Sequence, residues 1–232
     1  VTAGVFQTTA DGKFMAANPA LVRMLGYDSE DELLELDVAR DIYMDPEHRG
    51  NWTRTMQETG EVRNAELVLK RKDGSKIVVL ENSRAVSDAD GRTLFYEGTL
   101  TDITASHELS QQLSYEASHD ALTGLSNRRE FELRLQRALE MSQATGAEHA
   151  MLYLDLDRFK SVNDTSGHVA GDELLRQLGE VLQQRVRTND VVARLGGDEF
   201  GVLLHNCRLE DAQQIAANLL RTVDEFEFVW GT

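Results

Sequence analysis

The chain has 232 residues, of which 41% are hydrophobic and 28% charged, an ordinary composition for one or two globular domains. Its formal net charge of −16 argues against a broad nucleic-acid-binding surface. A nucleotide could still bind, because a metal ion and a few cationic side chains can neutralise its phosphates locally. No apolar run reaches the roughly 20 residues that span a bilayer, so we expect no membrane segment. The single cysteine cannot form an internal disulfide, which agrees with a cytoplasmic location.

The first hundred residues predict short helices between extended runs. Asn18 before Pro19 is typical of a capped helix start, Ser29 opens a second helix, and a third is expected over residues 46–59. Tight turns containing glycine separate the strands. The expected strands are residues 4–8, 13–16, 62–70, 76–86 and 94–101. Two strands, helices and then a three-stranded meander predict an α+β domain, with helices on one face of an antiparallel sheet.

Five short motifs in this region occur in a characteristic order. They are Asn18-Pro19-Ala20, Leu25-Gly26-Tyr27, the segment 45–49, the segment 72–75, and Thr101-Asp102-Ile103-Thr104. Together they resemble a PAS domain over residues 1–104, which implies a five-stranded sensor domain. The resemblance leaves the ligand of this domain unknown.

A polar, helix-favouring stretch without proline or glycine follows, and we expect a helical linker over residues 105–119. Leu109 and Leu113 are four residues apart and lie on one helical face. This face could be the seam of a parallel coiled coil that joins two protomers, but a solvated helix explains two apolar positions equally well.

The second half of the chain has a different pattern. Helices are expected over residues 128–144, 170–187 and 209–224, and strands over 150–156, 191–195 and 200–205. This succession predicts a ferredoxin-like, nucleotidyl-cyclase-type fold that lacks its last strand. Residues 226–230 would begin another strand, so we expect the chain to be part of a longer one.

Two acidic clusters follow or flank apolar strands in this half. Asp155 ends the first strand, and Asp198 and Glu199 follow the turn formed by Gly196 and Gly197. In a β-α-β-β sheet these strands are neighbours, so the carboxylates can meet at one edge and suit Mg²⁺. Glycines would also let the backbone approach a nucleotide closely. The alternative is an ordinary hairpin with solvated acids near its tip.

Four sequence motifs in this half of the chain occur together in one known family of domains. Gly196-Gly197-Asp198-Glu199-Phe200 is the signature of diguanylate cyclase (GGDEF) domains, and segments 120–129, 155–160 and 163–172 accompany it in the order of that family. The resemblance covers residues 120–232, taken as an incomplete GGDEF domain. It implies a cytoplasmic, signal-regulated enzyme that condenses two GTP molecules into cyclic di-GMP and pyrophosphate.

The resemblance also implies roles for individual residues. Mg²⁺, or Mn²⁺ in its place, would be bound by the Asp155 and Asp198 carboxylates and the Leu156 carbonyl. Asp198 would also act as the base, with Glu199 beside it, and Lys160 would place its charge on the phosphates. The substrate-binding residues would be Asn163, His168 and Asp172, with Gly196 and Gly197 at the turn. Of these, Asn163 and Asp172 would read the guanine edge.

Arg187 and Asp190 match the spacing of the family's product-inhibition motif. An arginine fork suits a phosphate or the edge of a guanine. The alternative is that Arg187 only stabilises the end of a helix.

Because each domain would hold one GTP, the reaction implies a homodimer, formed through the PAS domain and the linker. A different class of function stays open: an inactive GGDEF module that binds GTP or cyclic di-GMP and regulates an attached domain, such as an EAL phosphodiesterase.

Overall fold

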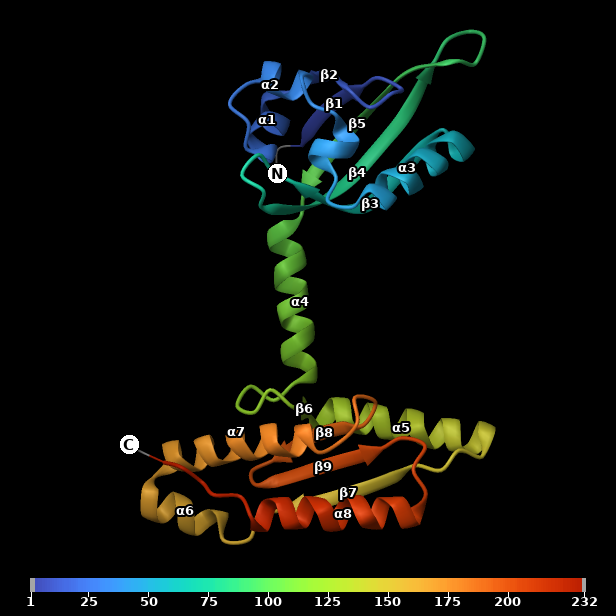
Figure 1. The fold of residues 1–232 in the computed structure, drawn as a ribbon. Coiled ribbons are helices and arrows are strands. Elements are labelled where there is room, and N and C mark those ends of the chain that lie inside the picture. The colour runs from blue at the N-terminus through green and yellow to red at the C-terminus, as the bar shows by residue number, and fades with distance from the viewer. Residues whose placement is uncertain (1–2, 231–232) are drawn as a thin grey trace. The chain divides into compact units, whose positions relative to one another are not determined.

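The computed structural model describes residues 3–230, which form two compact units divided between residues 111 and 112 (Figure 1). Each unit has its own sheet and its own hydrophobic core. Within the described residues, no helix combines the length and the hydropathy needed to cross a membrane.

The first unit contains a five-stranded, entirely antiparallel sheet with the order β2-β1-β5-β4-β3. The five strands are β1 (Gly4–Thr8), β2 (Phe14–Ala17), β3 (Glu61–Lys70), β4 (Lys76–Ser87) and β5 (Thr93–Asp102). This arrangement confirms the predicted α+β architecture with a five-stranded antiparallel sheet.

Short helices connect β2 to β3. They are α1 (Pro19–Leu25), α2 (Glu30–Leu34), the π-helical turn η1 (Val38–Ile42) and α3 (Pro46–Thr59). The predicted cap at Asn18 is present, because its side chain accepts a hydrogen bond from the Leu21 N–H at 2.9 Å. Gly60 ends α3 with a φ of 75°, a left-handed conformation that favours glycine. No side-chain pattern predicted η1, and π-helical turns of this kind are rare.

The predicted linker is helical. Helix α4 (Thr104–Ser118) begins directly after β5 and has no buried residue. Leu109 and Leu113 are 57% and 56% exposed, so neither side chain is covered within the chain.

The second unit contains a four-stranded sheet with the order β6-β8-β9-β7. Its elements are β6 (Ser126–Asn127), α5 (Arg128–Thr145), β7 (Ala150–Asp155), α6 (Phe159–Ser166), α7 (His168–Gln184), β8 (Val191–Gly196), β9 (Glu199–Leu204) and α8 (Leu209–Asp224). Strand β9 lies between β7 and β8 and is antiparallel to both. This is the split β-α-β arrangement of a ferredoxin-like fold.

Alternating side chains of β8 and β9 cover the two faces of this sheet. Val192 and Val202 pack in one cluster with α7 and α8, whereas Val191 and Leu203 pack in another with Phe131 of α5. The helices therefore hold the sheet rigidly between two layers, which fixes the position of the loops at its ends.

The structure differs from the expectations for this unit in two places. Helix α7 (His168–Gln184) agrees with the helix expected over about 170–187, but α6, which precedes it, was missed because its eight residues carry few apolar side chains. Residues 226–230 were predicted to start a strand, but they have no regular secondary structure. A strand needs a neighbouring strand with which to exchange backbone hydrogen bonds, and this stretch pairs with none among residues 3–230.

Candidate active site

The two acidic clusters meet at one end of the sheet. Asp155 is the last residue of β7, and its register partner is Glu199, the first residue of β9. Asp198 directly precedes Glu199. Asp155 is exposed, whereas Asp198 and Glu199 are half-buried, so all three carboxylates can reach a ligand from solvent. The expectation that the strand and the hairpin are neighbours is confirmed.

The turn between β8 and β9 requires its glycines for conformational reasons. Gly196 and Gly197 have φ angles of 142° and 56°, in the region that other residues rarely adopt. An added Cβ would find nothing within 4 Å at either position. The backbone at this turn is therefore open to solvent, and a ligand could approach it without obstruction.

Arg194 fixes the conformation of the turn. Its Nε and Nη2 atoms donate to the Gly197 carbonyl at 3.0 and 2.9 Å, and its Nη1 donates to Asp120 Oδ1 at 3.2 Å. Burial alone would raise the pKa of Asp120, but hydrogen bonds from Thr123 and the charge of Arg194 outweigh it, so the pKa is lowered. The ionised Asp120 therefore anchors the arginine that holds the turn.

A second arginine, Arg128 at the start of α5, contacts both sides of the same turn. Its Nε donates to the Leu195 carbonyl at 2.7 Å, and its Nη2 donates to Glu199 Oε2 at 3.2 Å. No role for Arg128, Arg194 or Asp120 was predicted from the sequence. The role of Arg194 could have been inferred from its position two residues before the Gly-Gly turn. Arg128 could not be recognised in this way, because it lies 67 residues before its partner Leu195 in the sequence.

Helices α6 and α7 bring the proposed guanine-reading residues together. A Cβ added to Gly171 would collide with the amide oxygen of Asn163 and lie 3.2 Å from Cζ of Phe159, so this glycine permits close packing of the two helices. Asp172 follows Gly171 and is exposed, whereas Asn163 is half-buried. The Asn163 amide therefore lies against Gly171, the residue that precedes Asp172 in α7.

The remaining expected residues lie between the end of β7 and the start of α7. Lys160 and His168 are exposed, at the first turn of α6 and at the start of α7. The Leu156 carbonyl accepts a hydrogen bond from the Phe159 N–H at 3.3 Å and retains a second lone pair. Arg158 begins α6 with a φ of 62°, a strained conformation for a residue with a side chain and one that often occurs near functional sites.

The donor set at this end of the sheet fits a hard cation. Within residues 3–230, no three His, Cys, Asp or Glu side chains are grouped as a complete metal site. A cation held by Asp155 and Asp198 would therefore need the Leu156 carbonyl, water or phosphate oxygens to complete its shell. Mg²⁺ is commonly bound in this way, through one or two carboxylates and substrate phosphates.

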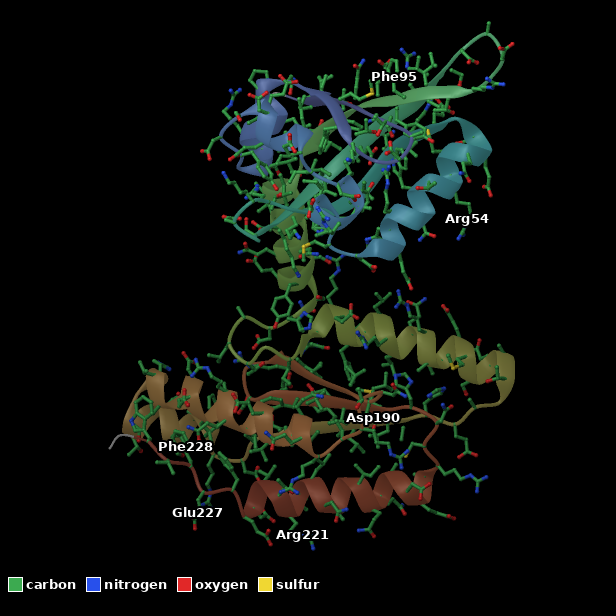
Figure 2. The ribbon with its side chains drawn as sticks, turned by 45° about the horizontal axis from the view of Figure 1, so that its top comes forward. Arg54, Phe95, Asp190, Arg221, Glu227 and Phe228 are labelled. Carbon is green, nitrogen blue, oxygen red and sulfur yellow. The ribbon has the colours of Figure 1, made fainter. Side chains whose placement is uncertain are left out.

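Arg187 and Asp190 lie away from the acidic clusters. Asp190, labelled in Figure 2, is 8% exposed. Its carboxylate accepts hydrogen bonds from the backbone N–H groups of Arg187 at 3.1 Å and His205 at 3.0 Å. His205 follows the opposite end of β9 from Glu199. Asp190 thus has a structural function that the sequence did not reveal, whereas the Arg187 side chain is exposed.

Comparisons with known proteins agree with this architecture. The model of the diguanylate cyclase GGDEF domain family matches residues 117–231, and a PAS domain model matches residues 2–105. The probable diguanylate cyclase DgcE of Escherichia coli is 37% identical over 94% of this chain and 20% of its own length. The diguanylate cyclase TpbB of Pseudomonas aeruginosa is 45% identical over 48% of this chain and 26% of its own length.

Among solved structures, the diguanylate cyclase SiaD of Pseudomonas aeruginosa, in complex with its activator SiaC, has a TM-score of 0.50 and 36% identity. That match covers 55% of this chain and 49% of SiaD. The chain spans about a fifth to a quarter of the length of DgcE and TpbB. The chain consists of a PAS domain over residues 2–105 followed by a GGDEF domain over residues 117–231.

Proposed function

We propose that the chain is a diguanylate cyclase, in which GTP binds at the β7 end of the GGDEF domain and two such sites combine to make cyclic di-GMP. The observation that carries this proposal is the pairing of Asp155 with Glu199 beside the open Gly196-Gly197 turn. These groups offer hard oxygen ligands and an accessible backbone in one place, which suits a metal-bound triphosphate.

Each side chain has a chemical role in this proposal. Asp155, Asp198 and the Leu156 carbonyl would hold Mg²⁺, which supplies positive charge to the phosphates. Asp198 takes the proton of the attacking 3′-hydroxyl, and Lys160 contacts the phosphate oxygens. The negative charge of Glu199 is partly neutralised by its salt bridge with Arg128, which also holds the Glu199 side chain at the edge of the site.

Guanine selectivity would come from the α6–α7 junction. Guanine has an N1–H and an amino group, and a carboxylate can accept hydrogen bonds from both. Adenine lacks the N1–H. The exposed Asp172 is suited to this edge, and the Asn163 amide can both donate and accept beside it. His168, at the first position of α7, adds a third polar group to the same junction.

The reaction needs two sites that face each other, because the 3′-hydroxyl of one GTP attacks the α-phosphate of the other and releases pyrophosphate. A homodimer formed through the PAS domain and α4 would supply that proximity. The exposed Leu109 and Leu113 are suited to a helix–helix contact between two copies.

The proposal is tested by incubating the purified protein with GTP and Mg²⁺ and separating the nucleotides. We expect cyclic di-GMP and pyrophosphate from GTP, no corresponding product from ATP, and a specific rate that rises with protein concentration. Tight GTP binding without any cyclic di-GMP would contradict the proposal and favour an inactive regulatory module.

We predict that Arg194 acts as a positioning residue for the turn. Arg194→Ala removes both hydrogen bonds to the Gly197 carbonyl, so Asp198 loses its fixed orientation. Small displacements of reacting groups cost about 10²-fold in rate, so kcat should fall by about that factor while the KM for GTP changes little. Arg194→Lys should restore little, because lysine lacks the planar fork. An unchanged kcat in both variants would contradict this role.

Product inhibition provides a separate prediction. Arg187→Ala should remove charge-assisted hydrogen bonds, each worth about 1.5–3 kcal/mol, and raise the half-inhibitory concentration of cyclic di-GMP at least about tenfold. Asp190 is the poorer probe, because its removal would leave two buried backbone N–H groups without partners. Arg185→Ala is a matched control, since Arg185 is exposed in the same connection. Identical inhibition curves for wild type and Arg187→Ala would leave Arg187 with a helix-stabilising role only.

A further inference from the structure

A small cavity lies inside the PAS domain. Its volume is about 30 Å³, and its wall is apolar except for Thr8, Tyr43, Arg49 and Glu81. A cavity of this size admits one or two water molecules when polar groups are present to bind them.

Glu81 is buried in the sheet and forms no salt bridge with any of residues 3–230. It lies in β4, is 3% exposed, and has Ala65 of β3 and Leu100 of β5 as register partners. Its Oε1 interacts with the indole Nε1 of Trp52 in α3, which donates a hydrogen bond at 2.8 Å. A carboxyl group in such surroundings costs much less free energy when it is neutral than when it is ionised.

Thr8 provides an independent observation. This β1 residue is 2% exposed, and its hydroxyl has no hydrogen-bond partner among residues 3–230. Buried hydroxyl groups are normally paired, and an unpaired one beside a cavity points to water. A water molecule in the cavity could accept from the neutral carboxyl of Glu81 and donate to the Thr8 hydroxyl.

Two other titratable groups face Glu81. Arg49 of α3 is half-buried and stacks on the Trp52 ring, with its Cζ 4.1 Å from the ring centroid, and its charge favours the ionised form of Glu81. Tyr43, after η1, is buried, and burial raises its pKa, so it stays neutral. The groups that face Glu81 from β1, β3 and β5 are uncharged. Burial is the largest influence on the pKa of Glu81 and raises it, although hydrogen bonding by Ser83 and Trp52 and the charge of Arg49 act in the opposite direction.

We propose that Glu81 is a proton-binding site, held as a neutral carboxylic acid in the folded PAS domain, and that loss of its proton loosens α3 from the sheet. Helix α3 is attached through Trp52 and Met56, which pack with Val62 and Tyr96. An ionised Glu81 needs a cation or more water than the one or two molecules that the cavity admits, and it can reach them only if the Trp52 contact opens or Arg49 moves inward. The PAS domain therefore responds to pH through α3.

The direction of the pH effect follows from the raised pKa. Unfolded glutamate titrates near pH 4.3, so above that pH the unfolded chain releases a proton that the folded domain retains. The contribution of Glu81 to stability is therefore largest below the unfolded pKa and is lost as pH rises through the folded pKa. Over this interval the unfolding equilibrium constant should increase up to about tenfold per pH unit.

The test uses the whole chain with Trp230→Phe, which leaves Trp52 as the sole tryptophan fluorophore. Urea unfolding followed by Trp52 fluorescence between pH 4.5 and 8 should become less pH-dependent in Glu81→Gln, whose side chain resembles the neutral acid. Difference infrared spectroscopy should detect a protonated carboxyl C=O band in the wild-type protein at pH 6 that is absent from Glu81→Gln. Glu66→Gln, an exposed change in β3, is the matched control and should alter neither result.

Two outcomes would overturn the proposal. One is the absence of any infrared band that Glu81→Gln removes, because an ionised Glu81 cannot give the C=O signal. The other is an identical pH dependence of Trp52 unfolding in the wild-type and Glu81→Gln proteins. The infrared result stands even where the substitution changes the stability of the domain.

Discussion

Replacing Asp198 by Ala should reduce cyclic di-GMP formation by about 10²–10⁴-fold. Two contributions are lost together, the base for the attacking hydroxyl and a carboxylate ligand for the cation, and each is typically worth a factor in this range. Losses of groups that act as a unit are not additive, so Asp155→Ala should give a similar defect and the double variant little more. The measurement is the initial rate of cyclic di-GMP formation from GTP and Mg²⁺, followed by chromatography.

The fold should survive these changes, because Asp155 is exposed and Asp198 half-buried, and neither takes part in a salt bridge within residues 3–230. Circular dichroism would verify this. Glu132→Gln removes one negative charge from the exposed face of α5 and should leave the rate unchanged, which separates a local effect from a change in net charge. Wild-type rates in the Asp198→Ala protein would contradict the assignment of this residue.

Replacing Asp172 by Ala should weaken GTP binding by about one to two orders of magnitude. The bound guanine would keep its N1–H and amino group without a carboxylate acceptor, and an unpaired polar group of this kind costs about 1–3 kcal/mol. Titration calorimetry with GTP and Mg²⁺ measures the change directly.

The specificity of that effect is as informative as its size. ATP presents a different base edge, so its weak binding should be the same in the wild-type and Asp172→Ala proteins. Glu180→Gln is an exposed change further along α7 and should not affect GTP affinity. Unchanged GTP affinity in Asp172→Ala would refute the placement of guanine at the α6–α7 junction.

Much of the architecture could be predicted because it depends on local signals. The caps at Asn18 and Ser29, the helix end at Gly60 and the apolar alternation of the strands each have a direct physical cause in a few neighbouring residues. The meeting of Asp155 and Glu199 was also predictable, since a split β-α-β sheet places their strands side by side.

What could not be predicted depends on tertiary contacts. Arg128 donates a hydrogen bond to the Leu195 carbonyl, and the buried Asp190 accepts one from the His205 N–H. Both contacts join segments that are distant in sequence. Residues 226–230 have the composition of a strand, but strand formation is decided by the presence of a pairing partner rather than by composition alone. Glu81 gave no signal for a similar reason, because an acid in a strand pattern is ordinarily a solvated residue.

The most direct test of the central claim is a crystal structure of the protein with a non-hydrolysable GTP analogue and Mg²⁺. We predict a guanine in contact with Asn163 and Asp172, a triphosphate beside the Gly196-Gly197 turn, and a cation bound by Asp155, Asp198 and the Leu156 carbonyl. A nucleotide bound elsewhere, or one whose phosphates do not contact this end of β7, would contradict the account.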